Sequence, residues 1–205
     1  MELAHRPKVD LYDIENYNFC DKNPHKPMRD ISTGARLTRL KRKFEERGCV
    51  RSVEAVLLVH IHHHPHIFVV RDAAGQYRLP GGKCHEVEDD KQCIMRKLRT
   101  FLGQEGGAAM GSHLGFTVGD LLGEWTRPNL EALLYPYCPP HITRPKEVRR
   151  VYLVRMPATF TFSVPKNMKL LSVPLFELFD NTTRFGSVVL ASLPQCLSRF
   201  QINYC

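Results

Sequence analysis

The segment LPGGKCHEVEDDKQCIMRKLRTFLG, residues 79–103, constrains the fold more than any other part of the chain. A strand is expected to end at Pro80, because the glycine pair that follows breaks regular structure. An acidic loop comes next, and then a helix from about Asp89 to Leu102 that stops at Gly103. Three apolar residues form the inward face of this helix: Ile94, Leu98 and Phe101. The chain is therefore built around a strand–loop–helix unit.

Hydrophobic patterning on both sides of this unit predicts further strands and helices. A helix is predicted over residues 32–47, capped by Ser32 or Thr33 and stopped by Gly48. The predicted strands are Val53–Ile61, His66–Arg71, Gln76–Pro80, Val148–Met156 and Phe160–Val164. Two short helices are expected near the C-terminus, LFELFD after Pro174 and another around Pro194–Phe200. The glycine- and proline-rich stretches 104–120 and 125–147 are predicted to lack regular structure.

This order of elements predicts an α/β (α+β) fold in a single domain. Residues 1–30 are polar and are predicted to form an extended N-terminal arm. Residues 31–205 are expected to form the domain, with helices as a C-terminal extension. Four apolar side chains could attach the arm to it: Leu11, Tyr12, Tyr17 and Phe19.

The charge balance favours an anionic partner. Lys and Arg number 29 against 21 Asp and Glu, which gives a formal net charge of +8. Nucleic acids and phosphorylated ligands are the usual partners of such a surplus, although a basic soluble protein without one is equally compatible with charge alone.

The cysteines and the termini indicate a reducing compartment. The seven cysteines are odd in number and form no C-x-x-C pair, which argues against a disulfide framework and a structural zinc site. No apolar run approaches the roughly 18 residues of a membrane span, and the N-terminus has no signal-peptide core. We therefore expect a cytosolic or nuclear protein with no membrane partner.

The strand–loop–helix unit resembles the Nudix box, G-x5-E-x7-R-E-U-x-E-E-x-G-U, where U is a bulky aliphatic residue. The skeleton fits at full spacing, through four positions besides Leu98: Gly82, Glu88, Arg96 and Gly103. The resemblance implies a Nudix α/β/α sandwich with a mixed sheet, here with an extra N-terminal helix and C-terminal helices.

The chemistry of a Nudix hydrolase does not fit this helix. Nudix enzymes hold magnesium with helix glutamates, and such a cation needs several oxygen ligands. The glutamate positions are Lys97, Thr100 and Phe101, and only the upstream Glu88 is kept. We therefore predict a protein that is not an enzyme, with no catalytic residues, no metal and no cofactor. The acidic run around Asp89 and Asp90 is better explained as a complement to the helix dipole than as a cation site.

Blocks outside the box resemble the small subunit of metazoan pre-mRNA cleavage factor I, a branch of the Nudix superfamily that has lost its glutamates. They include SVEAVLLVH, WTRPN, YPYCPPHITRPKE, VPKNMKLL, PLFELFDN and SLPQCLSRF. The resemblance implies a homodimeric nuclear subunit that binds single-stranded UGUA-like RNA upstream of poly(A) sites without hydrolysis. It further implies a larger RRM-containing subunit, poly(A) polymerase and poly(A)-binding protein as partners.

The same resemblance assigns the RNA-binding residues. Arg36, on the first helix, offers a planar fork of donors to base edges, and Glu54, on the first long strand, accepts from base amino and imino groups. Judged without the resemblance, Arg36 is explained by a surface ion pair and Glu54 by a charge at a strand edge.

Several positions depart from the family. In the family, two adjacent aromatic residues precede the sequence K-L-P-G-G. Gln76 and Tyr77 stand at these two positions here, and Leu79 is the leucine of the motif and a further predicted RNA-binding residue. Stacking on a base must therefore weaken, move to Tyr77 or be lost. A second aromatic is matched by Phe185 beside Gly186. A glutamate before the first helix has no counterpart, since Met28, Arg29 and Asp30 occupy that region.

Two other functions stay open from sequence. One is a Nudix-type binder or hydrolase of dinucleoside polyphosphates with an atypical metal site. The other is a scaffold whose RNA site has decayed. The run HIHHHPH, His60 to His66, can bind metal adventitiously, but it is expected to form a hairpin turn.

Overall fold

The computed structural model describes residues 6–24, 32–103, 115–131 and 133–205. The strands are β1 (Lys8–Leu11), β2 (Tyr17–Lys22), β3 (Val50–Ile61), β4 (His64–Arg71), β5 (Tyr77–Arg78), β6 (Gly81–Lys83), β7 (Thr117–Arg127), β8 (Glu147–Arg155), β9 (Phe160–Pro165), β10 (Lys169–Pro174) and β11 (Gln201–Tyr204). The helices are α1 (Thr33–Arg47), α2 (Asp90–Leu102), α3 (Leu175–Leu178), α4 (Thr182–Phe185) and α5 (Val188–Leu197), with a 3₁₀ turn at Ile14–Asn16.

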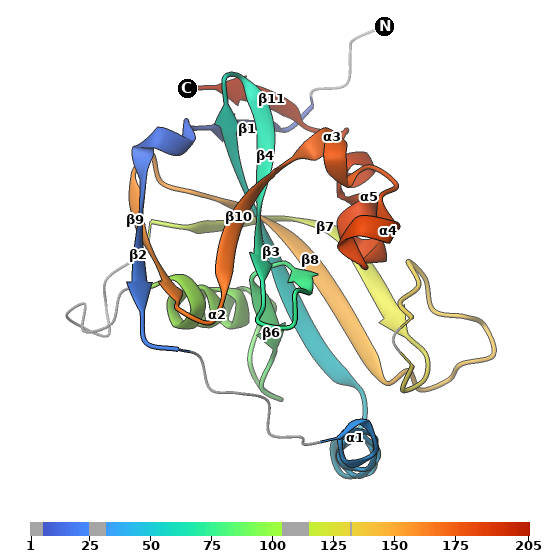
Figure 1. Cartoon of the computed structure of the whole chain (residues 1–205). Coiled ribbons are helices and arrows are strands. Elements are labelled where there is room, and N and C mark those ends of the chain that lie inside the picture. The colour runs from blue at the N-terminus through green and yellow to red at the C-terminus, as the bar shows by residue number, and fades with distance from the viewer. Residues whose placement is uncertain (1–5, 25–31, 104–114, 132) are drawn as a thin grey trace, which may run out of the picture.

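The centre of the molecule is a mixed sheet with the strand order β10-β4-β3-β8-β7 (Figure 1). Strands β3 and β8 run parallel, and the other pairs in this sheet are antiparallel. The short strands β5 and β6 pair with β4 and β3. The sheet is therefore mixed, as the sequence predicts.

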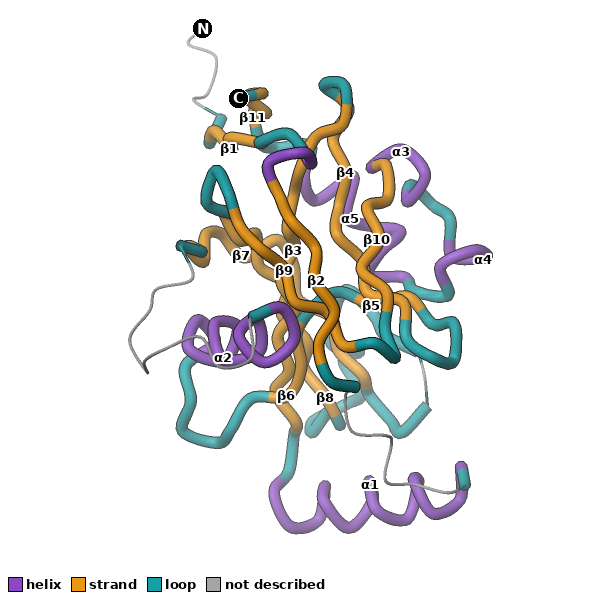
Figure 2. Tube along the Cα trace, turned by 60° about the vertical axis from the view of Figure 1, so that its left-hand side comes forward, coloured by secondary structure: helices purple, strands orange, loops and turns teal. Residues whose placement is uncertain are grey.

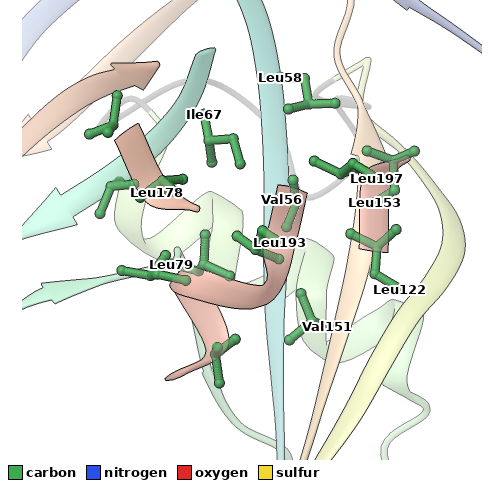
Figure 3. Close-up of a cluster of buried hydrophobic side chains, with 14 of the residues drawn as sticks. Val56, Leu58, Ile67, Leu79, Leu122, Val151, Leu153, Leu178, Leu193 and Leu197 are labelled. Carbon is green, nitrogen blue, oxygen red and sulfur yellow. The ribbon is translucent and has the colours of Figure 1, made fainter. Parts of the chain in front are cut away.

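Helices cover both faces of the sheet, and β3 is therefore buried on both sides. Alternate residues of β3 point in opposite directions. Val56 and Leu58 pack with Leu193 and Leu197 of α5 (Figure 3), whereas the intervening β3 residues pack with the apolar face of α2. The residues of that second cluster from β3 and α2 are Val53, Ala55, Leu57, Val59, Cys93, Ile94, Leu98 and Leu102. The predicted α/β/α sandwich is confirmed.

The N-terminal segment contributes two strands that the sequence does not predict. Strand β1 pairs in parallel with β11, and β2 pairs in parallel with β9, so both lie outside the central sheet (Figure 2). Leu11 is 0% exposed and Tyr17 is 4% exposed, which confirms that they attach this segment to the domain. Strand β1 alternates exposed and buried residues over only four positions, and most of β2 is exposed, so neither strand is long or apolar enough to be predicted from its pattern.

Helix α1 lies away from the sheet, near the lower ends of β3 and β8 (Figures 1 and 2). Ser32 caps its first turn by accepting from the Ala35 N–H at 3.2 Å, and Gly48 ends it with φ of +75°. The Phe44 ring carries the Lys146 ammonium 3.3 Å from its centroid. The helix is therefore held to the domain through a cation–π contact rather than a broad apolar face.

Helix α2 is the helix of the Nudix box, and both of its ends match the prediction. The Asp89 carboxylate accepts from the Lys91 N–H at 3.2 Å, which confirms its role at the positive end of the helix. The Gly103 N–H donates to Arg99 O at 3.0 Å. A Cβ on Gly103 would lie 2.6 Å from that same oxygen, so only glycine fits at this stop.

Several predicted boundaries are wrong. The last helix begins at Val188, because Ser187 caps it by accepting from the Leu190 N–H at 3.3 Å, and Pro194 lies inside it instead of opening it. Part of stretch 104–120 and the start of stretch 125–147 belong to β7, which runs from Thr117 to Arg127. The predicted strand Gln76–Pro80 is reduced to β5, and β10, β11 and α4 were not predicted.

The histidine run forms the turn between β3 and β4, as predicted. His62 and His63 both have positive φ, 49° and 60°, which suits a tight hairpin. His60 is buried, and its Nε2 lies 3.3 Å from Cys205 O at the chain's C-terminus. Among the residues that the structure describes, no helix is long and apolar enough to cross a membrane.

Candidate functional site

Glu88 and Arg96 form the centre of the degenerate box. Arg96 Nε donates to Glu88 Oε1 at 2.6 Å, and Arg96 Nη2 donates to the other carboxylate oxygen. That second oxygen, Glu88 Oε2, also accepts a hydrogen bond from the His85 N–H at 3.0 Å. The hydrogen bonds from Arg96 lower the pKa of Glu88 to about 2. The box therefore uses its remaining glutamate in an internal ion pair.

The three positions that replace glutamates supply no carboxylate. Lys97 lies over the glycine pair, since a Cβ on Gly82 would be 3.2 Å from its Nζ. Thr100 Oγ1 donates to Arg96 O at 2.9 Å within the helix, and the Phe101 ring lies 6.0 Å from the Arg78 guanidinium carbon. An ammonium, a hydroxyl and a ring do not fit the magnesium site of a Nudix hydrolase.

The acidic residue at the start of α2 is also committed to protein partners. The Asp90 carboxylate accepts from Arg150 Nη1 at 3.0 Å and from the Tyr152 hydroxyl at 2.9 Å. Arg51 Nη1 lies 3.5 Å from the other Asp90 oxygen. Asp90 is buried, so these donors balance a charge that water does not reach.

A buried charge network lies beside the box, across β3, β7 and β8. Arg149 Nη1 contacts Glu54 Oε1 at 3.0 Å, and its Nη2 contacts Glu147 Oε1 at 3.1 Å. Glu147 also accepts from Ser52 Oγ at 2.6 Å and lies 3.0 Å from Arg127 Nε. Glu54 is thus a largely enclosed ion-pair partner on the central strand β3. It is not the strand-edge charge of the alternative interpretation.

The two carboxylates of this network are held in different electrostatic states. Burial raises the pKa of Glu54 more than its Arg149 partner lowers it. Burial also acts to raise the pKa of Glu147, but Arg149, Ser52 and Arg127 outweigh it, and its pKa is lowered. Glu54 is therefore the carboxylate that gains most from a further hydrogen-bond donor or cation.

Cations from α1 face this network. Burial lowers the pKa of Lys83, and the neighbouring charges of Lys43 and Arg39 lower it further. Burial likewise lowers the pKa of Arg127, and Arg36 contributes to that shift. Helix α1 lies beyond one end of the sheet (Figure 2), and the charges of three of its residues act on Lys83 of β6 and Arg127 of β7. We define the basic rim as Arg36, Arg39, Lys43, Lys83 and Arg127.

The aromatic positions predicted to stack on bases lie differently from expectation. Phe185 is 3% exposed and packs edge-on against Tyr77, with ring centroids 5.1 Å apart. Leu79 is also buried in the core. Gln76 and Gly186 are exposed, and Tyr77 is half-buried beneath the Arg71 guanidinium, 5.6 Å from its ring centroid. A base can therefore reach Tyr77 but not the Phe185 ring in this conformation.

Most of the charge network and one residue of the basic rim are not predicted from the sequence. The network residues are Ser52, Arg127, Glu147 and Arg149, and the rim residue is Lys83. A signal was present, because Arg149 and Arg150 interrupt an otherwise apolar strand, and successive strand residues face opposite sides. Met28, Arg29 and Asp30 lie outside the described residues, so the structure does not place the missing glutamate position.

A sequence model of the NUDIX_2 family, described as nucleotide hydrolase, matches residues 7–200. An Arabidopsis thaliana protein named pre-mRNA cleavage factor Im 25 kDa subunit 2 is 44% identical over 98% of this chain and 98% of its own length. The chain belongs to the NUDIX_2 family, as a homologue of this 25 kDa subunit.

Other relatives of this family agree. The Arabidopsis thaliana protein named subunit 1 is 37% identical over 98% of this chain and 89% of its own length. A Dictyostelium discoideum protein named cleavage and polyadenylation specificity factor subunit 5 is 34% identical over 95% and 94%. Among solved structures, a C. elegans Ap4A hydrolase aligns at 12% identity and a TM-score of 0.48, covering 73% of this chain and 95% of that chain. The three cleavage-factor relatives and the family match confirm the resemblance predicted from the sequence blocks.

Proposed function

We propose that this protein is the RNA-binding subunit of a pre-mRNA cleavage and polyadenylation machinery, and that it binds single-stranded UGUA-like RNA without hydrolysing it. The observation that carries the proposal is the basic rim beside the Glu54–Arg149 pair, whose side chains are 12% and 21% exposed. Cations attract the phosphate backbone, while a preorganised carboxylate and guanidinium distinguish base edges. The names of the relatives support the assignment to 3′-end processing.

Electrostatics supports the proposed absence of hydrolysis. A unit charge 4 Å away contributes about 4 kcal/mol at an effective dielectric constant near 20. Lys97 therefore opposes a divalent cation at the position where a Nudix glutamate would attract one, and Arg96 already neutralises Glu88. The same positive charge favours an RNA phosphate on this face.

Partner assignments come from the relatives and the resemblance. A homodimer in the nucleus is proposed, together with a larger RRM-containing subunit, poly(A) polymerase and poly(A)-binding protein. Sedimentation equilibrium tests the homodimer: we expect a particle of 47.2 kDa, twice the 23.6 kDa of the chain. A mass of 23.6 kDa at micromolar concentration would contradict the dimer and leave the RNA assignment intact.

Fluorescence anisotropy with a short labelled RNA tests the proposed function. We expect micromolar or tighter binding to a UGUA oligonucleotide and about 5- to 150-fold weaker binding to UCUA, because one lost base contact costs about 1–3 kcal/mol. Equal affinity for both RNAs would reject sequence selectivity. Failure to bind either RNA would reject the RNA function.

Arg36→Ala tests the residue assignment. Arg36 contributes to the basic rim, so its removal is expected to weaken UGUA binding about tenfold. Arg42→Ala is the matched control, because Arg42 lies on the same helix and pairs with Glu46 at 3.5 Å, and its charge is not among those that shift the pKa of Lys83 or Arg127. An equal loss for both variants would show that only net charge matters.

Hydrolysis is tested separately with diadenosine tetraphosphate and magnesium. We expect no release of mononucleotide above the rate without protein. Magnesium-dependent turnover that survives repurification would overturn the non-hydrolytic part of the proposal and favour the alternative of a dinucleoside polyphosphate hydrolase.

A further inference from the structure

Two of the seven cysteines face each other at the start of the box helix. Cys84 follows β6, and Cys93 lies in the second turn of α2. Their sulfur atoms and a Glu88 carboxylate oxygen all lie within 4.8 Å of one another. Cys93 is fully buried, whereas Cys84 is half-buried and within reach of solvent. The other cysteines are not grouped in this way in the part of the chain that the structure describes.

A metal ion is a poor occupant for this group. Both oxygens of Glu88 already accept hydrogen bonds from Arg96, and one of them also accepts from the His85 N–H. The Arg96 guanidinium also donates to Cys93 Sγ at 3.5 Å, which places a positive charge where a cation would bind. The possible ligands of a cation here are therefore two thiols and the Glu88 carboxylate, which is already hydrogen-bonded, and the Arg96 guanidinium would repel the cation.

The two thiols have different chemical characters. The hydrogen bond from Cys93 lowers the pKa of Cys84, and the charge of Arg51 contributes to the same shift. The Cys93 thiol, which donates that bond and is buried, has its pKa raised. A half-buried thiol that ionises readily beside a second thiol is the usual arrangement of an attacking and a resolving cysteine.

We propose that Cys84 and Cys93 form a reversible redox pair, with Cys84 as the site of attack on a hydroperoxide and Cys93 as the resolving thiol. The linkage would join β6, which pairs with β3 opposite Glu54, to the first turns of α2. It would close a loop over residues 85–92 without using any other cysteine.

The reaction balances in two steps. The Cys84 thiol first loses its proton to solvent. The thiolate attacks the hydroxyl oxygen of the hydroperoxide, the O–O bond breaks, and Cys84 becomes a sulfenic acid, while the leaving alkoxide or hydroxide takes up a proton from solvent and departs as an alcohol or water. Cys93 sulfur then attacks Cys84 sulfur, the S–O bond breaks, and water leaves with the Cys93 proton. Two electrons pass from the thiols to the peroxide. A dithiol reductant restores both thiols by exchange.

Arg96 assists the second step. Once Cys84 is a neutral sulfenic acid, Cys93 no longer donates its proton toward a thiolate, and the guanidinium 3.5 Å away favours the thiolate of Cys93. The two sulfurs must still approach from their present separation to the 2.05 Å of a disulfide. Rotation of the Cys84 side chain, on a loop after a three-residue strand, supplies that movement.

Peptide mapping of the full chain tests the pair directly. Trypsin cuts after Lys83, Lys91 and Arg96, which places Cys84 in peptide 84–91 and Cys93 in peptide 92–96. After treatment with hydrogen peroxide and blocking of free thiols, we expect these two peptides joined and two hydrogens lighter. The joined species is expected to form at least fivefold faster than any linkage through the exposed Cys138, and to vanish on adding dithiothreitol.

Two variants separate the roles. Cys138→Ser is the control and is expected to leave the linked peptides unchanged. Cys93→Ala is expected to abolish the link and to leave a sulfenic acid on Cys84 that dimedone traps. Separate alkylation of peptides 84–91 and 92–96 after peroxide treatment would overturn the proposal. Equimolar zinc that survives desalting and protects both thiols would overturn it in favour of a metal site.

Discussion

Glu88 occupies the position of a Nudix-box glutamate, yet its carboxylate faces Arg96 rather than solvent. Its side chain is 12% exposed, so the two hydrogen bonds from the guanidinium are only weakly screened by water. Charge-assisted bonds of this kind are about twice as strong as neutral ones. A residue that serves catalysis in related folds therefore stabilises the loop before α2 here.

The Glu88–Arg96 pair gives a prediction for pH dependence. Folding lowers the pKa of Glu88 from its ordinary 4.5 to about 2, so its stabilisation is complete above pH 4.5 and is lost as the pH falls toward 2. Glu88→Gln is expected to lower the free energy of unfolding by about 2 kcal/mol at pH 7. Urea unfolding followed by circular dichroism is expected to show that difference shrinking below pH 4.5.

Glu86→Gln is the matched control for this measurement. Glu86 lies in the same loop but is mostly exposed, and it lies 3.8 Å from an equally exposed Arg47. Exposed pairs contribute about 0–1 kcal/mol, so the control is expected to change stability little at any pH. A Glu88→Gln effect that equals the control, or that grows in acid, would contradict the assignment.

Among the elements, α2 depends on a strand that is remote in sequence. Lys22, at the end of β2, donates from Nζ to Thr100 O at 2.8 Å and to Gly103 O at 3.0 Å. The last carbonyls of a helix have no partner within it, and a cation there also complements the helix dipole. The N-terminal segment therefore fixes the C-terminal end of the box helix.

Lys22→Met is expected to loosen that end of α2. The loss of two charge-assisted hydrogen bonds at a partly exposed site is expected to cost about 1 kcal/mol. Hydrogen exchange is expected to accelerate at the amides of Arg99 to Gly103, with no change in the first turn of the helix. Lys8→Met, in β1, serves as the control, and equal acceleration in both variants would indicate a general loss of stability.

At the scale of the whole molecule, the first strands belong to the core rather than to a detachable arm. Leu11 packs in the cluster that contains α5, and Tyr17 packs in the cluster that contains α2. The β1–β11 pair also joins the two ends of the chain (Figure 1). The N-terminal segment therefore contacts both layers of the sandwich.

Leu11→Ala tests this integration. Removing a fully buried leucine side chain is expected to lower the free energy of unfolding by about 2–5 kcal/mol, because it loses transfer free energy and leaves a cavity. Chemical denaturation is expected to show one cooperative transition with a lower midpoint. Leu133→Ala, at an exposed position, is the control. A loss below about 0.5 kcal/mol for Leu11→Ala would indicate a loosely attached arm.

Sequence alone determined the features that depend on local order. The spacing of Gly82, Glu88, Arg96 and Gly103 specified the strand–loop–helix unit, since turn and cap preferences act within a few residues. The two β-branched, apolar runs of β3 and β4, joined by a short polar turn, specified the hairpin at the centre of the sheet. The replacement of glutamates by Lys97, Thr100 and Phe101 is likewise a fact of sequence.

Only the tertiary structure decided which distant charges meet. Arg149 meets Glu54 because β3 and β8 lie parallel and adjacent, although the two residues are far apart in the chain. Burial, which sets the strength of that ion pair, likewise depends on what packs over it. The same holds for Phe185, whose ring is enclosed by Tyr77 and not open to a base. Local patterns specify elements, whereas their packing determines which functional side chains are exposed.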